Sequence, residues 1–157
     1  MSCDAAAAAF LMFSSATPSA PAPQVTPAVA STAPVAGEPL FKDIVGRAGR
    51  LKARVETYRK ALGPAPAALS LPDFDLFRAE IGQLAVLDQQ GHELLKARGS
   101  DGDLKCILHG ISQDLPLKLA AVAAAKSGRD QDQALRDMAY LLNDNIEVIT
   151  APPTPPV

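Results

Sequence analysis

Cys106 and His109 come closest, by type and spacing, to a chemical site in this sequence. Three residues apart on a helix, a thiol and an imidazole share one face and can supply two metal ligands. A stable site for a soft metal needs three or four such ligands, and His92, the one other histidine, lies on a different predicted helix. We therefore expect no metal and no cofactor. We interpret both cysteines, Cys3 and Cys106, as free thiols.

The rest of the sequence contains no pattern that predicts catalysis. No serine stands between the glycines of a nucleophile elbow, no glycine-rich phosphate loop occurs, and the carboxylates are spread over predicted helix surfaces. Aromatic residues make up 4% of the chain and Trp is absent, so large ligand-stacking surfaces are not expected. The sequence predicts a non-enzymatic protein without catalytic residues.

Basic residues are concentrated in the predicted first helix. Residues 38–62 contain seven basic and three acidic side chains, although the whole chain has a net charge of −2. Arg47, Arg50 and Arg54 are spaced to lie on one helix face, which can bind an acidic partner or pair with the acidic helices of its own bundle. Because no aromatics are interleaved, we expect no nucleic-acid binding and take the three arginines as candidate partner-binding residues.

His92 suggests an alternative function. The segment HELLK at residues 92–96 is similar to the H-x-L-K-G signature of histidine-phosphotransfer domains, which are helical bundles. It contains one extra residue, which rotates Lys96 by about 100° relative to the histidine, and Ala97 stands in place of the glycine. The resemblance implies a signalling protein that carries a phosphoryl group on His92.

A second resemblance lies at residues 83–87. The segment QLAVL resembles the Gln-Leu-x-Leu-Phe peptide by which bacterial proteins bind the replicative sliding clamp. Such peptides dock as extended segments in an apolar groove, so this resemblance implies a clamp-binding inhibitor or toxin that uses Gln83, Leu84 and Leu87. Leu84 and Leu87 also have the spacing of core residues in a helix.

The first predicted helix has the clearest pattern. Its apolar positions alternate in steps of three and four, which is the spacing of a single buried stripe, and Gly63-Pro64 ends it. Gly46 and Gly49 each cost about 1 kcal/mol against Ala in an exposed helix interior, so we expect another helix to approach closely there. The stripe consists of Phe41, Ile44, Ala48, Leu51, Val55, Tyr58 and Leu62.

Three further apolar stripes predict three further helices. The second begins near Pro72 and ends at Arg98, and the third begins at Asp101 or Asp103. Pro116 should kink the third helix or split it in two, because a mid-helix proline loses a hydrogen bond and clashes with the preceding turn. The fourth follows residues 126–128 and should start with a capping box formed by Asp130 and Gln133. Short connections favour antiparallel neighbours.

Both ends of the chain have a different composition. Residues 1–37 predict a disordered Ala/Pro/Ser/Thr-rich tail, and residues 151–157 a disordered Pro-rich end. The apolar run at 5–13 is too short for a transmembrane helix, which needs about 20 residues, but residues 1–16 have the length of an export signal without its basic start. We expect a cytoplasmic protein, with a periplasmic or secreted one as the alternative.

The sequence thus predicts an all-α protein, an up-down four-helix bundle at residues 38–150 behind the N-terminal tail. The long apolar stripe with flanking charges can be completed by a partner helix as well as by its own chain. We therefore expect a helical protein–protein interaction protein, in one version an accessory or subunit of a bacterial secretion or envelope apparatus. Its partner would be another protein or a second copy of the chain.

Overall fold

The computed structural model describes residues 35–62, 67–99 and 102–151. The predicted export signal (residues 1–16) and most of the predicted tail (1–37) and Pro-rich end (151–157) lie outside these described residues. A short 3-10 helix, η1 (Val35–Gly37), leads into the first long helix, and Val35 and Ala36 pack against the core.

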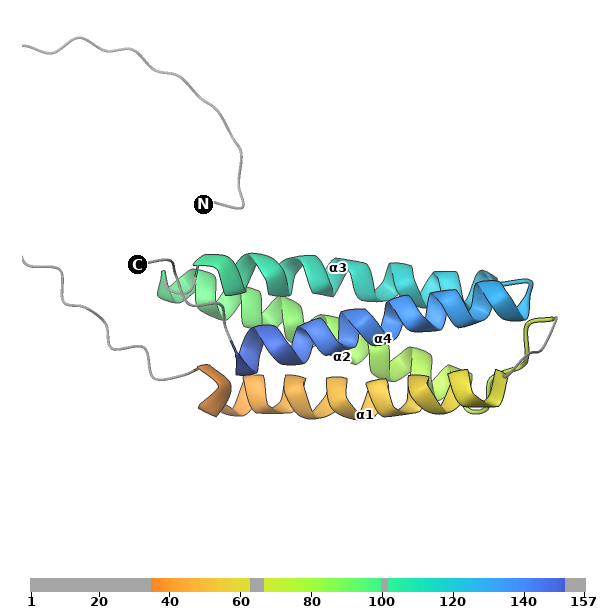
Figure 1. Cartoon of the computed structure of the whole chain (residues 1–157). Helices are drawn as coiled ribbons and strands as arrows, with labels where there is room; N and C mark the ends of the chain where they lie inside the picture. Colours follow the sequence, from red (N-terminus) through yellow and green to blue (C-terminus); the bar gives the residue numbers. More distant parts are fainter. Residues whose placement is uncertain (1–34, 63–66, 100–101, 152–157) are drawn as a thin grey trace, which may run out of the picture.

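Four long helices form an up-down bundle, as the sequence predicts. They are α1 (Pro39–Leu62), α2 (Phe74–Arg98), α3 (Gly102–Ala124) and α4 (Gly128–Thr150), and each runs opposite to the one before it (Figure 1). The main packing pairs are α2 with α3 and α1 with α4, followed by α3 with α4, while α1 and α2 are the most loosely packed neighbours. None of these helices is sufficiently long and apolar to cross a membrane.

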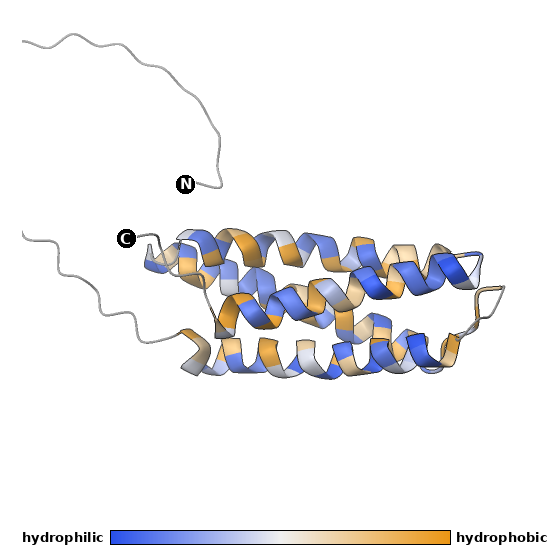
Figure 2. Cartoon of the chain, in the orientation of Figure 1, coloured by the Kyte–Doolittle hydropathy of each residue, from blue (hydrophilic) through white to orange (hydrophobic). Residues whose placement is uncertain are grey.

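The apolar stripe of α1 is buried in full. All seven of its predicted core residues are at most 3% exposed, and polar residues separate them along the helix (Figure 2). Pro39 occupies the first helical position, where its missing N–H would have no intrahelical partner anyway. The α1 helix therefore forms for the reason its pattern indicates, which is burial of one face.

The close helix approach occurs at a different glycine from those predicted. Among the residues that the structure describes, a Cβ on Gly49 would meet no atom within 4 Å, and one on Gly46 would meet only the Arg50 side chain, so the predicted approach there is wrong. On α2, a Cβ on Gly91 would lie 3.1 Å from Cδ1 of Leu108 and 3.3 Å from Cε1 of Phe41. Side chains of α1 and α3 fill the space that Gly91 leaves.

Pro116 does not split α3, which continues as one helix from Gly102 to Ala124. The side chain of Pro116 is exposed, while Leu115 beside it is fully buried. The carbonyl that loses its hydrogen bond thus lies on the solvent side, where water can satisfy it. The anchoring of Leu115 in the core keeps the two halves of the helix together.

The cap of α4 lies one turn earlier than predicted. Ser127 is the N-cap, because its Oγ accepts from the backbone N–H of Asp130 at 3.1 Å and donates to the Asp130 carboxylate at 2.7 Å. Asp130 is therefore the third helical residue rather than the cap. The prediction failed because both Asp130 and Ser127 are good capping residues by type, and only the backbone distinguishes them.

Candidate functional site

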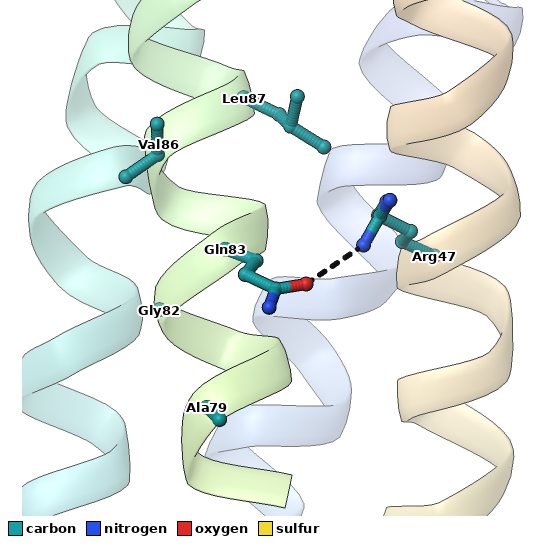
Figure 3. Close-up of a pocket in the computed structure, with 6 residues that line it drawn as sticks. All are labelled: Arg47, Ala79, Gly82, Gln83, Val86 and Leu87. Atoms are coloured by element: carbon teal, nitrogen blue, oxygen red, sulfur yellow. Dashed lines mark hydrogen bonds between the residues drawn. The ribbon is translucent and has the colours of Figure 1, made fainter. Parts of the chain in front are cut away.

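A groove lies between α1 and α2, the two most loosely packed neighbours in the bundle. It has a volume of about 440 Å³ and is shallow and widely open to solvent. Figure 3 shows the side chains around it, with Arg47 contributed by α1 and the others by α2. The groove is lined by Arg47, Ala79, Gly82, Gln83, Val86 and Leu87.

The groove exists because α2 places small residues on its outer face. Ala79 and Gly82 follow each other at a spacing of three residues, and a Cβ on Gly82 would meet no atom of the described residues within 4 Å. Val86, one turn further on, is 57% exposed. The floor of the groove is thus mainly apolar and leaves the Val86 side chain exposed to water. Exposure of apolar surface to water is unfavourable, and a bound apolar group would bury this surface.

Arg47 joins the two sides of the groove. Its Nε donates to the Asp43 carboxylate at 3.0 Å, and its Nη1 donates to Oε1 of Gln83 on α2 at 3.0 Å (Figure 3). The sequence singled out Arg47 and Gln83 for two separate functions, and the structure brings them together at one site. Both side chains are positioned by hydrogen bonds and keep part of their surface in solvent.

The other two candidate arginines lie in a separate, smaller hollow, the basic end, which shares Arg47 with the groove. It has a volume of about 70 Å³ and is lined by Arg47, Arg50, Leu51, Arg54 and Glu80. Arg54 donates to Glu80 of α2 at 2.8 Å. Arg50 is exposed and makes no hydrogen bond or ion pair within the described residues. Arg50 therefore carries the charge at this end that is most available to an acidic group.

The segment that resembles a clamp-binding peptide is part of α2. Gln83 and Leu87 line the groove, but Leu84 is 0% exposed and belongs to the core. To dock as an extended peptide, the segment would have to unwind and remove Leu84 from the core. In the folded bundle the three residues do not share one accessible surface.

His92 lies at the interface of α2 with α3 and is 6% exposed. Its Nδ1 donates to the carbonyl of Lys105 at 2.7 Å, and its ring contacts that of His109, with centroids 4.8 Å apart and the ring planes tilted by 32°. His109 bonds in turn to Gln89, with 2.9 Å between Nδ1 and Oε1. These contacts hold the His92 ring inside the bundle, whereas a phosphoryl group must reach its acceptor nitrogen from solvent.

Cys106 is partly exposed on α3 and takes part in a disulfide bond. The disulfide bond shows that the prediction of a free thiol at this position is wrong. A partly exposed thiol is accessible to oxidation. Cys3 lies outside the described residues. Within residues 35–62, 67–99 and 102–151, no group of three or more His, Cys, Asp or Glu side chains is placed to hold a metal ion.

Asp88 and Asn145, which are both 0% exposed, were not among the residues predicted from the sequence. Nδ2 of Asn145 donates to Oδ2 of Asp88 at 2.9 Å. Desolvation raises the pKa of Asp88 to about 8, and the hydrogen bond from Asn145 opposes this rise. A signal was present, because Asp88 follows Leu84 by four residues and Asn145 follows Leu142 by three, so both stand at core positions of their stripes.

Comparison with known proteins adds no relative from which a function can be transferred. No protein-family model matches the chain. No curated protein matches it significantly, and neither does any solved structure. The chemistry of the groove and of the core is therefore the basis for the proposals that follow.

Proposed function

We propose that this chain is a non-enzymatic helical protein that binds an acidic, amphipathic helix of another protein in the groove between α1 and α2. The observation that carries the proposal is the combination of an open apolar floor with a basic end. An amphipathic helix in a groove is a common recognition mode, in which apolar side chains at a spacing of three or four residues act as anchors.

The apolar part of the groove specifies what the partner inserts. Its volume of about 440 Å³ accommodates one or two aliphatic or aromatic side chains. Gly82 leaves room for close approach of a partner helix, and Val86 and Leu87 provide apolar contact. Burial of these surfaces supplies affinity in proportion to the apolar area removed from water.

The basic end specifies the sign of the charge on the partner helix. The described helix α1 contains seven basic residues against two acidic ones, and Arg50 has no acidic partner within the described residues. A carboxylate one or two turns from the apolar anchor would therefore meet Arg50. Rim charges of this kind mainly set orientation and association rate. In this proposal the apolar anchor therefore provides affinity, and Arg50 provides specificity.

A helix library displayed on phage tests this proposal, because the protein itself then selects the helices that it binds. Selection on the wild-type protein should enrich helices with apolar residues four apart and with Asp or Glu nearby. Gly82→Leu fills the floor and should weaken binding of the selected helices more than tenfold, and Arg50→Glu should weaken acidic helices selectively.

Gly110→Leu is the matched control, because Gly110 is also an exposed helical glycine whose Cβ would meet no described atom within 4 Å. It lies on α3, away from the groove. Equal binding by Gly82→Leu and Gly110→Leu would contradict the proposed site. Enrichment of basic or uncharged helices would contradict the proposed partner chemistry.

A further inference from the structure

Asp88 and Asn145 meet across the diagonal of the bundle. In the described part of the chain α2 and α4 do not pack directly against each other. The hydrogen bond between these two side chains, 2.9 Å long and fully buried, nevertheless links the two helices through the core. A polar link at this depth requires that the hydrogen-bonding capacity of both groups be satisfied.

Hydrogen bonding is incomplete if Asp88 is ionised. Oδ1 of Asp88 and Oδ1 of Asn145 are both buried and have no hydrogen-bond partner among the described residues. A carboxylate offers acceptors only, and the free oxygen of the amide is an acceptor as well. A protonated carboxyl group has one O–H donor, which is what this pair lacks. A single proton can therefore satisfy both oxygens.

Within the part of the chain that the structure describes, the surroundings of Asp88 offer no charge that would stabilise a carboxylate. The buried residues of α1 and α3 are all apolar apart from the Tyr58 hydroxyl, which bonds to the carbonyl of Pro72. On α4, Asn145 is neutral and Asp144 beside it is partly exposed. On α2, His92 is directed towards α3. Desolvation consequently dominates and raises the pKa of Asp88 to about 8.

We propose that the core of the bundle contains a proton-binding site, in which one proton on Asp88 completes a two-armed acid–amide pair with Asn145. An unfolded Asp side chain is ionised at neutral pH, so folding takes up this proton from solvent. The site makes the stability of the bundle depend on pH and does not rest on the proposed partner-binding function.

The direction of this dependence follows from the two ionisation states. Because the carboxyl binds its proton more tightly in the folded protein, its contribution to stability is complete below about pH 4 and is lost as the pH rises to about 8. Above that value both states are ionised and the contribution no longer changes. Alkaline conditions thus weaken the link between α2 and α4.

Urea unfolding of the full chain at pH 5 to 9, compared with Asp88→Asn, tests the site. Between pH 5 and 7 the unfolding equilibrium constant of the wild type should rise about tenfold per pH unit relative to the variant, which is the effect of one proton. Asn at position 88 can form the same two-armed pair without a proton, so the variant should fold. Parallel pH profiles would overturn the proposal.

Asp114→Asn is the control, because Asp114 is an exposed carboxylate on α3. The unfolding equilibrium constant of Asp114→Asn should depend on pH in the same way as that of the wild type. A second measurement needs no variant: the infrared band of a protonated carboxylic acid should be present in the folded wild type at pH 6.5 and absent at pH 10. Absence of the band at pH 6.5 would overturn the proposal even if Asp88→Asn failed to fold.

Discussion

The two faces of α2 meet their neighbours in opposite ways. Towards α1 and α3, Gly91 is enclosed, and a Cβ there would lie 3.1 Å from Leu108. Towards the groove, a Cβ on Gly82 would have no atom of residues 35–62, 67–99 or 102–151 within 4 Å. Glycine thus permits close packing at one position and leaves an open floor at the other. A helical glycine therefore leaves an accessible surface only when no neighbouring side chain fills the space that its own missing side chain would occupy.

Truncation of neighbouring apolar residues should show the difference between core and groove most strongly. Leu84→Ala removes a fully buried side chain and should lower the free energy of unfolding by about 2–5 kcal/mol. Val86→Ala affects a residue that is 57% exposed and should change it by less than about 0.5 kcal/mol. Urea unfolding followed by circular dichroism measures both. Similar losses would show that Val86 is buried in solution and that the groove is closed.

The same substitution at the two glycines should have opposite signs. Gly91→Ala requires Leu108 and Phe41 to give way by a few tenths of an ångström, which should cost about 1–3 kcal/mol, and the higher helix propensity of Ala offsets at most about 1 kcal/mol of this cost. Gly82→Ala should stabilise it by up to about 1 kcal/mol, since Ala is the better helix former and nothing obstructs its Cβ. Thermal and urea unfolding give both values. If Gly82→Ala instead destabilised the protein, another group would have to cover the floor of the groove in solution.

The ion pair between Arg54 and Glu80 should contribute least. Both side chains are about one-third exposed, at 32% and 37%, and such surface pairs contribute about 0.2–1 kcal/mol. A double-mutant cycle with Arg54→Ala and Glu80→Ala measures the coupling. A coupling above about 2 kcal/mol would mean that this pair holds α1 and α2 together rather than lining an accessible rim.

The sequence predicts the helices better than it predicts how their faces meet. The stripe of α1 is confirmed at every position because a single rule, burial of apolar side chains, determines it. Asp88 and Asn145 were missed because that rule considers apolar residues alone, although both occupy core positions in register. Polar residues at such positions are the signal to examine first in a bundle of this kind.

The candidate site was predictable only in part. The spacing of Arg47, Arg50 and Arg54 indicated a basic face, and the structure places the three at the basic end, which shares Arg47 with the groove. The contact between Arg47 and Gln83 could not be predicted, because it depends on the rotation of α1 relative to α2. Helix periodicity fixes which residues share a face but leaves the angle between two helices to the packing of the whole core.

The most direct test of the central claim, that the groove between α1 and α2 is the binding surface, is a backbone NMR titration with the selected acidic helix. We predict that the largest amide shifts occur at Arg47, Gly82, Gln83 and Val86, and that Gly82→Leu abolishes them while Gly110→Leu preserves them. Shifts centred on α3 and α4, or a footprint that Gly82→Leu leaves unchanged, would contradict the claim.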